Sequence, residues 1–449
     1  MSESKYKSLS FQSINRLAIP AIISGIAEPL LSITDTAIIG NLSVNATESL
    51  AAVGIAGSFI SAIVWILAQT RSAISAIVAR YFGAENLQSI EFLPSQIIFI
   101  NILLSLIIYV VTVGFASEIF HLYQAQGLIH EFSVSYYKIR AMGIPLTLFV
   151  FSVFGVFRGL QNTYWPMVIS IVGALLNVGL DFLLVFGFKD IIPAMGIEGA
   201  AYASLLAQLV MAVMSVYLLL TKTPFKFSFN FNFHPEIKRI LSLSFNLIIR
   251  ALSLNFALYL ANAYATGYGN AHIAAQTIAF QIWLFFAFFI DGYASVGNIM
   301  SGKFLGQEKP ETITVLSRTL VKFTIFITLI IGAFCFIFYK NIGLIFSKEA
   351  DVLTLFYEIF WLVILMQPIN AIAFVFDGIF KGMAEAVTLR NTLLIATFIG
   401  FTPTLFLADY FGLELYGIWI AFWVWMLLRG GILIVIYNRK YLNFSKIIS

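Results

Sequence analysis

Long apolar stretches recur along almost the whole of this 449-residue chain. Each is long enough to cross a bilayer, because about 20 residues of helix span roughly 30 Å of hydrocarbon. We predict twelve of them, near residues 17–40, 50–79, 93–117, 133–158, 165–188 and 197–221, and then near 240–266, 272–302, 316–339, 357–380, 391–411 and 415–438. The pattern lacks the short alternating strands of a membrane β-barrel. The sequence therefore predicts an all-α polytopic membrane protein.

The composition agrees with a membrane protein and leaves few other classes open. Hydrophobic residues make up 60% of the chain and charged residues 11%, whereas soluble domains carry about 25% charged residues. The net charge of +4 comes from loop lysines and arginines and gives no reason to expect nucleic-acid binding. Cys335 is the only cysteine, so an intrachain disulfide is excluded. The polar segment 1–15 has no cleavage site, and we expect the first span to act as the targeting signal.

Positive charge is distributed unequally between the two sides of the predicted spans. If the N-terminus is cytoplasmic, the outer loops contain only Lys189, Lys340 and Lys348, and most other loop lysines and arginines lie inside. Cytoplasmic loops of membrane proteins carry the excess of Lys and Arg. The sequence therefore predicts a multi-pass protein of the inner membrane with both termini in the cytoplasm.

An internal repeat divides the chain into two halves. Three motifs of the first half recur 223 residues later, and they pair Gly83 with Gly306, Pro145 with Pro368, and Gly155 with Gly378. We predict a cytoplasmic N-terminal segment at 1–15, a first lobe at 16–221, a cytoplasmic linker at 222–236 and a second lobe at 237–449. Six spans per lobe make both halves enter from the same side, as in transporters with parallel repeats. Such a duplication favours a transporter that alternates access by moving one lobe against the other.

The first half carries carboxylates inside its predicted spans. Glu28 and Asp35 lie in the first span, two helical turns apart, and Asp181 lies in the fifth with Asn177 one turn before it. By the helical rise, Asp35 is roughly 10 Å and Asp181 roughly 7 Å beyond the membrane centre on the outer side. Two carboxylates at one depth in a low dielectric tend to share a proton or a cation. The alternative is that each separately belongs to a structural polar network.

The second half also carries two acids inside its predicted spans, Asp291 and Asp377, but at a different depth. Asp377 lies four residues before Lys381, so we expect a helical ion pair at the cytoplasmic edge. Asp291 has no such local partner, and it is the better functional candidate of the two. Neither acid lies at the outer depth of Asp35 and Asp181, so we expect ion coupling in the first lobe.

Four basic residues also fall inside predicted spans. We expect Lys138 and Arg140 to reach the nearby outer interface with their long side chains. Arg71 and Arg250 are expected to face the bundle interior and neutralise acids.

No motif of an enzyme occurs in the sequence. The zinc-binding His-Glu-x-x-His helix, the Gly-x-Ser-x-Gly elbow and the phosphate-binding Gly-x-x-x-x-Gly-Lys loop are all missing. The four histidines, His121, His130, His234 and His272, form no metal-ligand spacing. We therefore expect no enzymatic activity, no cofactor and no bound metal, and energy supplied by an ion gradient.

Several of these motifs together resemble one transporter family. The first span, with its Glu-Pro and Asp-Thr pairs between Glu28 and Thr36, and residues 157–162 (FRGLQN) resemble the multidrug and toxic compound extrusion (MATE) family. Residues 177–181 (NVGLD), 367–370 (QPIN) and 377–380 (DGIF) resemble its DinF-like branch. The resemblance covers essentially the whole chain. It implies a V-shaped pair of six-helix bundles that exports organic cations in exchange for protons or sodium.

The resemblance also implies roles for individual residues. Asp35, Asn177 and Asp181 match the cation site of the branch's first lobe. In that branch, protonation is thought to bend the first helix near a proline, and Pro20 occupies its place here.

Four further positions follow from the same comparison. Tyr136 and Ser204 resemble flanking polar members of the site, and Glu28 stands where some relatives carry Gln. Asn370 occupies the place of a second-lobe acid used by the other bacterial branch. This difference argues against a sodium site in the second lobe and favours protons.

The sequence thus predicts a secondary active efflux antiporter for small drug-like, often cationic, compounds. Asp35 and Asp181 would carry the proton, with Na⁺ as the alternative ion at the same residues and Asn177, and Pro20 would let the first helix bend. We expect a monomer in the lipid bilayer. A lipid-linked saccharide flippase of the same superfamily is the first alternative, although such flippases often have extra spans and a markedly basic cavity. A membrane-embedded enzyme is the second.

Overall fold

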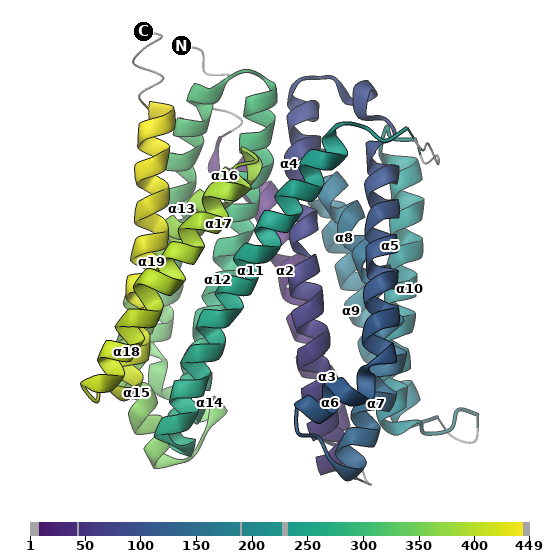
Figure 1. Ribbon diagram of the computed structural model, residues 1–449, viewed down its shortest axis with the longest axis vertical. Coiled ribbons are helices and arrows are strands. Elements are labelled where there is room, and N and C mark those ends of the chain that lie inside the picture. Colours follow the sequence, from purple (N-terminus) through teal and green to yellow (C-terminus); the bar gives the residue numbers. More distant parts are fainter. Residues whose placement is uncertain (1–8, 43–44, 189–190, 227–231, 443–449) are drawn as a thin grey trace. The chain divides into compact units, whose positions relative to one another are not determined.

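Helices make up almost all of the described part of the chain (Figure 1). The computed structural model describes residues 9–42, 45–188, 191–226 and 232–442, without the side chains of residues 28–33 and 442. Within these ranges the β contact is an isolated bridge between Phe188 and Ile192. The prediction of an all-α protein is confirmed.

Among the described residues the first half contains nine α-helices, several of which are consecutive parts of one predicted span. In chain order they are α2 (Phe11–Ile39), α3 (Ala46–Leu67), α4 (Gln69–Gly83), α5 (Leu93–Gly114), α6 (Ala116–Leu122), α7 (Gly127–Ala141), α8 (Ile144–Gly159), α9 (Tyr164–Val185) and α10 (Gly196–Lys222).

In the described residues the second half continues with further α-helices and two π-helical turns, the second of which is Asn438–Leu442 after α19. The elements are α11 (Glu236–Tyr268), α12 (Asn270–Gly306), α13 (Pro310–Ile337), α14 (Tyr339–Phe346), α15 (Ala350–Leu365), α16 (Gln367–Gly382), α17 (Ala386–Ile395), the π-helical turn Ala396–Phe401, α18 (Thr402–Tyr410) and α19 (Glu414–Tyr437).

Two predicted spans are bent at the prolines of the internal repeat. Helices α7 and α8 meet at 43°, and α15 and α16 meet at 47°. Pro145 and Pro368 lie in the first turns of α8 and α16. A proline is tolerated there because its missing N–H has no intrahelical partner in the first turn, whereas it cannot continue the preceding helix. The repeat in sequence is therefore also a repeat of local structure.

The described residues contain nine helices long and apolar enough to cross a membrane, or up to eleven if each bent pair is one span. Helix α2 occupies the place of the first predicted span, and some of its side chains lie outside the described residues. The chain is thus a multi-pass membrane protein.

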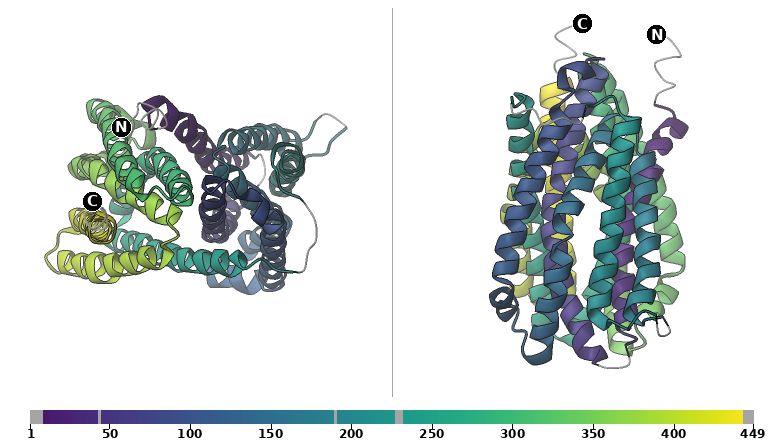
Figure 2. Two further views of the ribbon diagram at one scale, coloured as in Figure 1. Left: turned by 90° about the horizontal axis from the view of Figure 1, so that it is seen from above. Right: turned by 90° about the vertical axis from the view of Figure 1, so that its right-hand side faces the viewer.

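The contacts divide the chain into two compact units. The N-unit is Ile23–Leu241, and the C-unit is Met1–Ile22 with Ser242–Ser449. Within each unit the helices lie side by side along the long axis (Figures 1 and 2). The division falls inside α2, because its first half packs in the C-unit, where Tyr293 Oη donates to Asn15 Oδ1 at 2.6 Å.

The C-unit depends on close approach of α12 and α16. A Cβ atom on Gly378 would lie 1.9 Å from the carbonyl oxygen of Ala294. Only glycine leaves space for the two backbones at this point, because contacts below 3.0 Å force atoms to shift. The repeated glycine thus sets the distance between two helices.

Gly378→Ala is therefore expected to destabilise the C-unit by about 1–3 kcal/mol, the usual effect of overpacking. The measurement is the unfolding temperature of the detergent-solubilised protein. Gly431→Ala is the matched control, because Gly431 is also helical and its Cβ would meet nothing within 4 Å. Equal unfolding temperatures for the two variants would contradict the packing argument.

Candidate functional site

The N-unit brings two buried acids together. Asp35 on α2 is 3% exposed and Asp181 on α9 is fully buried. Their carboxyl groups are adjacent and are placed to share a hydrogen bond. Such a bond needs a proton on one of them, because two ionised carboxylates have only acceptors.

A short polar chain connects this acid pair to α10. Ser204 Oγ donates to Asp35 Oδ2 at 3.3 Å, and Asn177 Nδ2 donates to Ser204 Oγ at 3.2 Å. Both Ser204 and Asn177 are buried. Residues from α2, α9 and α10 thus form one connected group.

The helical register of α9 explains why two of these residues face inward. Its buried positions recur every three or four residues. Asn177 and Asp181 belong to this stripe, one turn apart, together with Gly173 and Val185. The amphipathic pattern therefore places an amide and a carboxylate on a face that apolar side chains otherwise occupy.

Several oxygens of the group receive no hydrogen bond from the described residues. They are both carboxylate oxygens of Asp181, Oδ1 of Asp35 and Oδ1 of Asn177. A buried acceptor without a donor is unfavourable by about 1–3 kcal/mol. A proton between the two carboxyls would satisfy one oxygen of each acid, and the same hard oxygen atoms would also suit a small cation. No cluster of three or more His, Cys, Asp or Glu residues suited to a metal occurs among the residues that the structure describes.

Helix α7 adds two further side chains to the group. Tyr136 is 3% exposed and interacts electrostatically with both acids. Arg140 lies one turn later and is hydrogen-bonded to Tyr136. The expectation that Arg140 extends to the outer interface is wrong, because its Nε is buried and its charge acts on Asp35 and Asp181. Lys138, on another face of the helix, is exposed as expected.

Two other predicted residues lie on α2 itself. Pro20 is part of the helix, which runs without a break from Phe11 to Ile39. The side chain of Glu28 lies outside the described residues. Their predicted roles stay predictions.

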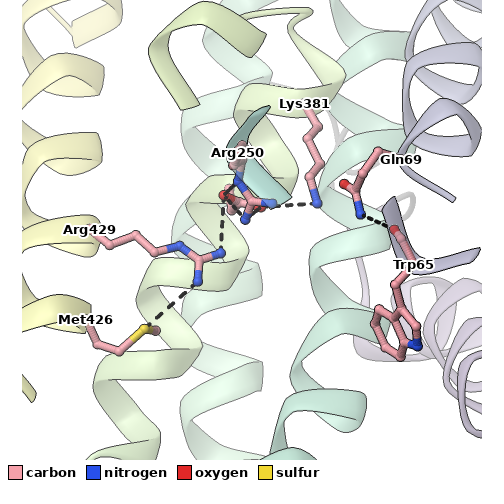
Figure 3. Close-up of polar contacts among 7 residues, drawn as sticks. Trp65, Gln69, Arg250, Lys381, Met426 and Arg429 are labelled. Carbon is pink, nitrogen blue, oxygen red and sulfur yellow. Dashed lines mark hydrogen bonds and ion pairs between the residues drawn. The ribbon is translucent and has the colours of Figure 1, made fainter. Parts of the chain in front are cut away.

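A second buried charge cluster lies in the C-unit (Figure 3). Arg250 donates to both oxygens of Asp377 at 2.8 Å. Lys381 Nζ is 3.1 Å from Asp377 Oδ2, and Arg429 Nη2 is 3.2 Å from Oδ1. The expected pair of Asp377 and Lys381 is confirmed, as is the expectation that Arg250 neutralises an acid. Arg429 was missed, although a lone arginine in the last apolar span (WMLLRGGILI) is a signal for a buried partner.

The remaining candidates also belong to the C-unit. Asn370 is buried, and its Nδ2 donates to Gln367 Oε1 at 3.0 Å. Asp291 is exposed and interacts electrostatically with Lys381 and Arg429. The structure therefore groups Asp291 with the Asp377 cluster and not with Asp35.

The family model MatE matches residues 20–183 and 247–406, which is most of the chain and includes Asp35, Asn177 and Asp181. The chain belongs to the MatE family. Its members are transporters and not enzymes, so the expected absence of enzymatic activity holds, and the DinF-like assignment agrees with a bacterial relative.

Two curated relatives and one solved structure illustrate the match to the MatE family. The DNA damage-inducible protein F of Escherichia coli is 24% identical over 97% of this chain and 93% of its own length. Protein DETOXIFICATION 42 of Arabidopsis thaliana is 28% identical over 67% of this chain, and the match spans 56% of that protein. An outward-facing multidrug resistance MATE transporter has the same fold, with a TM-score of 0.88, 21% identity and 96% of each chain covered.

Proposed function

We propose that this MatE-family chain is a secondary active antiporter that exports organic, often cationic, compounds in exchange for protons. The observation that carries the proposal is the buried pair Asp35 and Asp181, whose unsatisfied oxygens would accept one proton or one cation. A proton and an organic cation exclude each other when both need the same negative charge, and this competition is the physical basis of exchange. The name of the multidrug resistance transporter with the same fold supports drug-like substrates.

Each residue of the group has a proposed role. Asp35 and Asp181 hold the proton, and Asn177 orients Asp35 through Ser204. Pro20 lowers the cost of bending α2, because a proline inside a helix removes one backbone hydrogen bond. Tyr136 closes one side of the acid pair. Glu28, Asp291 and Asn370 are proposed as supporting or substrate-lining residues.

The proposed architecture is twelve transmembrane helices in two six-helix lobes, 16–221 and 237–449, joined by the linker 222–236. The protein would be a monomer of the inner membrane with the segment 1–15 and the C-terminus in the cytoplasm. The positive-inside distribution of Lys and Arg supports this orientation.

Protons are proposed over sodium as the coupling ion. A proton satisfies the acid pair with one hydrogen bond between the two carboxyls, whereas Na⁺ needs five or six oxygen ligands at fixed distances by analogy with other hard cations. Asp35, Asp181, Asn177 and Ser204 are four ligand groups, and they supply six oxygens only if both carboxylates bind through both of their oxygens. Na⁺ at Asp35, Asp181 and Asn177 stays the alternative.

The test is ethidium efflux from proteoliposomes containing the purified full chain. An inward proton gradient at uniform sodium is expected to drive efflux, and its collapse by a protonophore is expected to stop it. A sodium gradient at uniform pH is expected to have no effect. If the sodium gradient alone drives efflux, the coupling ion is Na⁺ and not the proton. If neither gradient changes the rate of efflux, the protein is not an antiporter of either ion.

A further inference from the structure

Arg140 lies at the depth of the acid pair, although its helix begins at the outer end of the N-unit. Two contacts determine the register of α7 against α10. Ser135 Oγ donates to Glu198 at one end, and Gly143 packs against the side chain of Gln208 further along. Both helices advance by 1.5 Å per residue, so Arg140 falls level with Ser204. Since Ser204 Oγ donates to Asp35, Arg140 is at the depth of Asp35.

The side chain of Arg140 bonds to Tyr136, lies within electrostatic range of both acids, and is incompletely bonded. It shares a helix face with Tyr136, four residues earlier, to which it is hydrogen-bonded. Its charge acts on both Asp35 and Asp181. Its Nε is buried and has no hydrogen-bond partner among the described residues. An ionisable side chain in a spanning segment almost always faces the bundle interior or a wet cavity and pairs there with another charge or with backbone carbonyls.

Arg140 is a cation that acts on both acids of this pair. Arg158 on α8 donates to Ser24, and Glu198 accepts from Ser135. The other acidic, basic and histidine side chains on α7, on α10 and on the helices packed against them are Glu48 on α3, Glu118 and His121 on α6, His130, Glu131 and Lys138 on α7, and Lys222 on α10. The electrostatic environment of the pair therefore depends on Arg140.

We propose that Arg140 is a positioning residue of the coupling site, whose fixed charge sets the pH at which the acid pair gives up its proton to a monovalent organic cation. The inference rests on the proposed antiport. With Arg140, the group carries charges of −1, 0 and +1 when it holds no proton, one proton and two protons. In a low dielectric the neutral state is favoured, so the pair holds one shared proton. Replacing that proton by one monovalent cation also leaves the group neutral.

Without Arg140 the same states would carry −2, −1 and 0. The pair would then be neutral only with two protons, and it would release a proton only at higher pH. An opposite charge at close range changes proton affinity by about one to three pH units. Arg140 thus lowers the pH at which the shared proton is released to an organic cation.

The experiment is ethidium binding to the detergent-solubilised full chain as a function of pH, followed by fluorescence. Arg140→Gln is expected to move the pH of half-maximal binding upward by about one to three pH units. Arg140→Lys is expected to remain within about one pH unit of the wild type, because the charge is kept. Lys138→Gln removes the same charge two residues away from an exposed position and is expected to change nothing.

The outcomes separate this inference from the proposed function. If wild-type binding depends on pH and Arg140→Gln keeps the same midpoint while eluting as a folded monodisperse protein, Arg140 has no part in proton exchange. If Lys138→Gln shifts the pH of half-maximal binding equally, the effect comes from the net charge of the protein and not from the position of Arg140. This result would overturn the proposal. If wild-type binding is independent of pH, the proton coupling itself fails, and the inference fails with it. If Arg140→Gln does not fold, Arg140→Met takes its place, because it also removes the charge. It is expected to show the same shift in the pH of half-maximal ethidium binding.

Discussion

Asp35→Asn is expected to reduce proton-driven ethidium efflux to the level of empty proteoliposomes. An amide has nearly the same shape as a carboxyl group but does not exchange a proton, so the acid pair is left with Asp181 alone. The hydrogen bond from Ser204 at 3.3 Å can be kept by the amide oxygen. The fold should therefore survive while coupling is lost. The measurement is the initial rate of efflux under an imposed pH gradient.

The matched control is Glu131→Gln, which neutralises an exposed carboxylate near the start of α7. Its efflux rate is expected to equal that of the wild type. Asp181→Asn should reproduce the loss seen with Asp35→Asn, because both carboxyls belong to one group. If Asp35→Asn exports ethidium at an undiminished rate, Asp35 is not part of the coupling site.

Asp377→Asn is expected to destabilise the C-unit by about 3–5 kcal/mol, the usual effect of removing one partner of a buried ion pair. Asp377 is the carboxylate that contacts Arg250, Lys381 and Arg429, and all four side chains are at most 13% exposed. Without its charge, three cations are buried together and repel one another. The measurement is the unfolding temperature by tryptophan fluorescence, for which the buried Trp419 and Trp425 of the C-unit are suitable reporters.

Two further variants test the electrostatic origin of this effect. Asp351→Asn removes an exposed carboxylate of the C-unit and is expected to change stability by less than about 0.5 kcal/mol. In the Asp377→Asn background, Lys381→Gln is expected to restore part of the stability, because it removes one of the repelling cations. Equal stability of Asp377→Asn and the wild type would show that the cluster does not support the unit.

The local pattern of the sequence was sufficient for the helices and for the core of the candidate site. Depth along two predicted spans was enough to place Asp35 and Asp181 at one level, and the structure brings their carboxyl groups together. The stripe of α9 likewise predicted that Asn177 and Asp181 share a face. Such predictions succeed because they need only the helical rise and the direction of each span.

The same reasoning failed for Arg140, which was assigned to the interface. Depth alone does not distinguish a long side chain that extends to water from one that turns inward. The choice depends on the rotation of α7 about its axis, and packing against α3 and α10 determines that rotation. Lys138 and Arg140 are two residues apart, so they face different environments.

The sequence by itself determined the class of the protein, its repeat with the paired prolines Pro145 and Pro368, and the acids of the first span and the fifth. These features follow from hydrophobicity, proline and helical periodicity, which are properties of one segment at a time. Only the tertiary structure decided which cations meet which acids. It grouped Arg429 with Asp377, and it directed Arg140 to the pair Asp35 and Asp181. The physical reason is that charge pairing in a membrane protein depends on the relative rotation of separate helices, and no single segment contains that information.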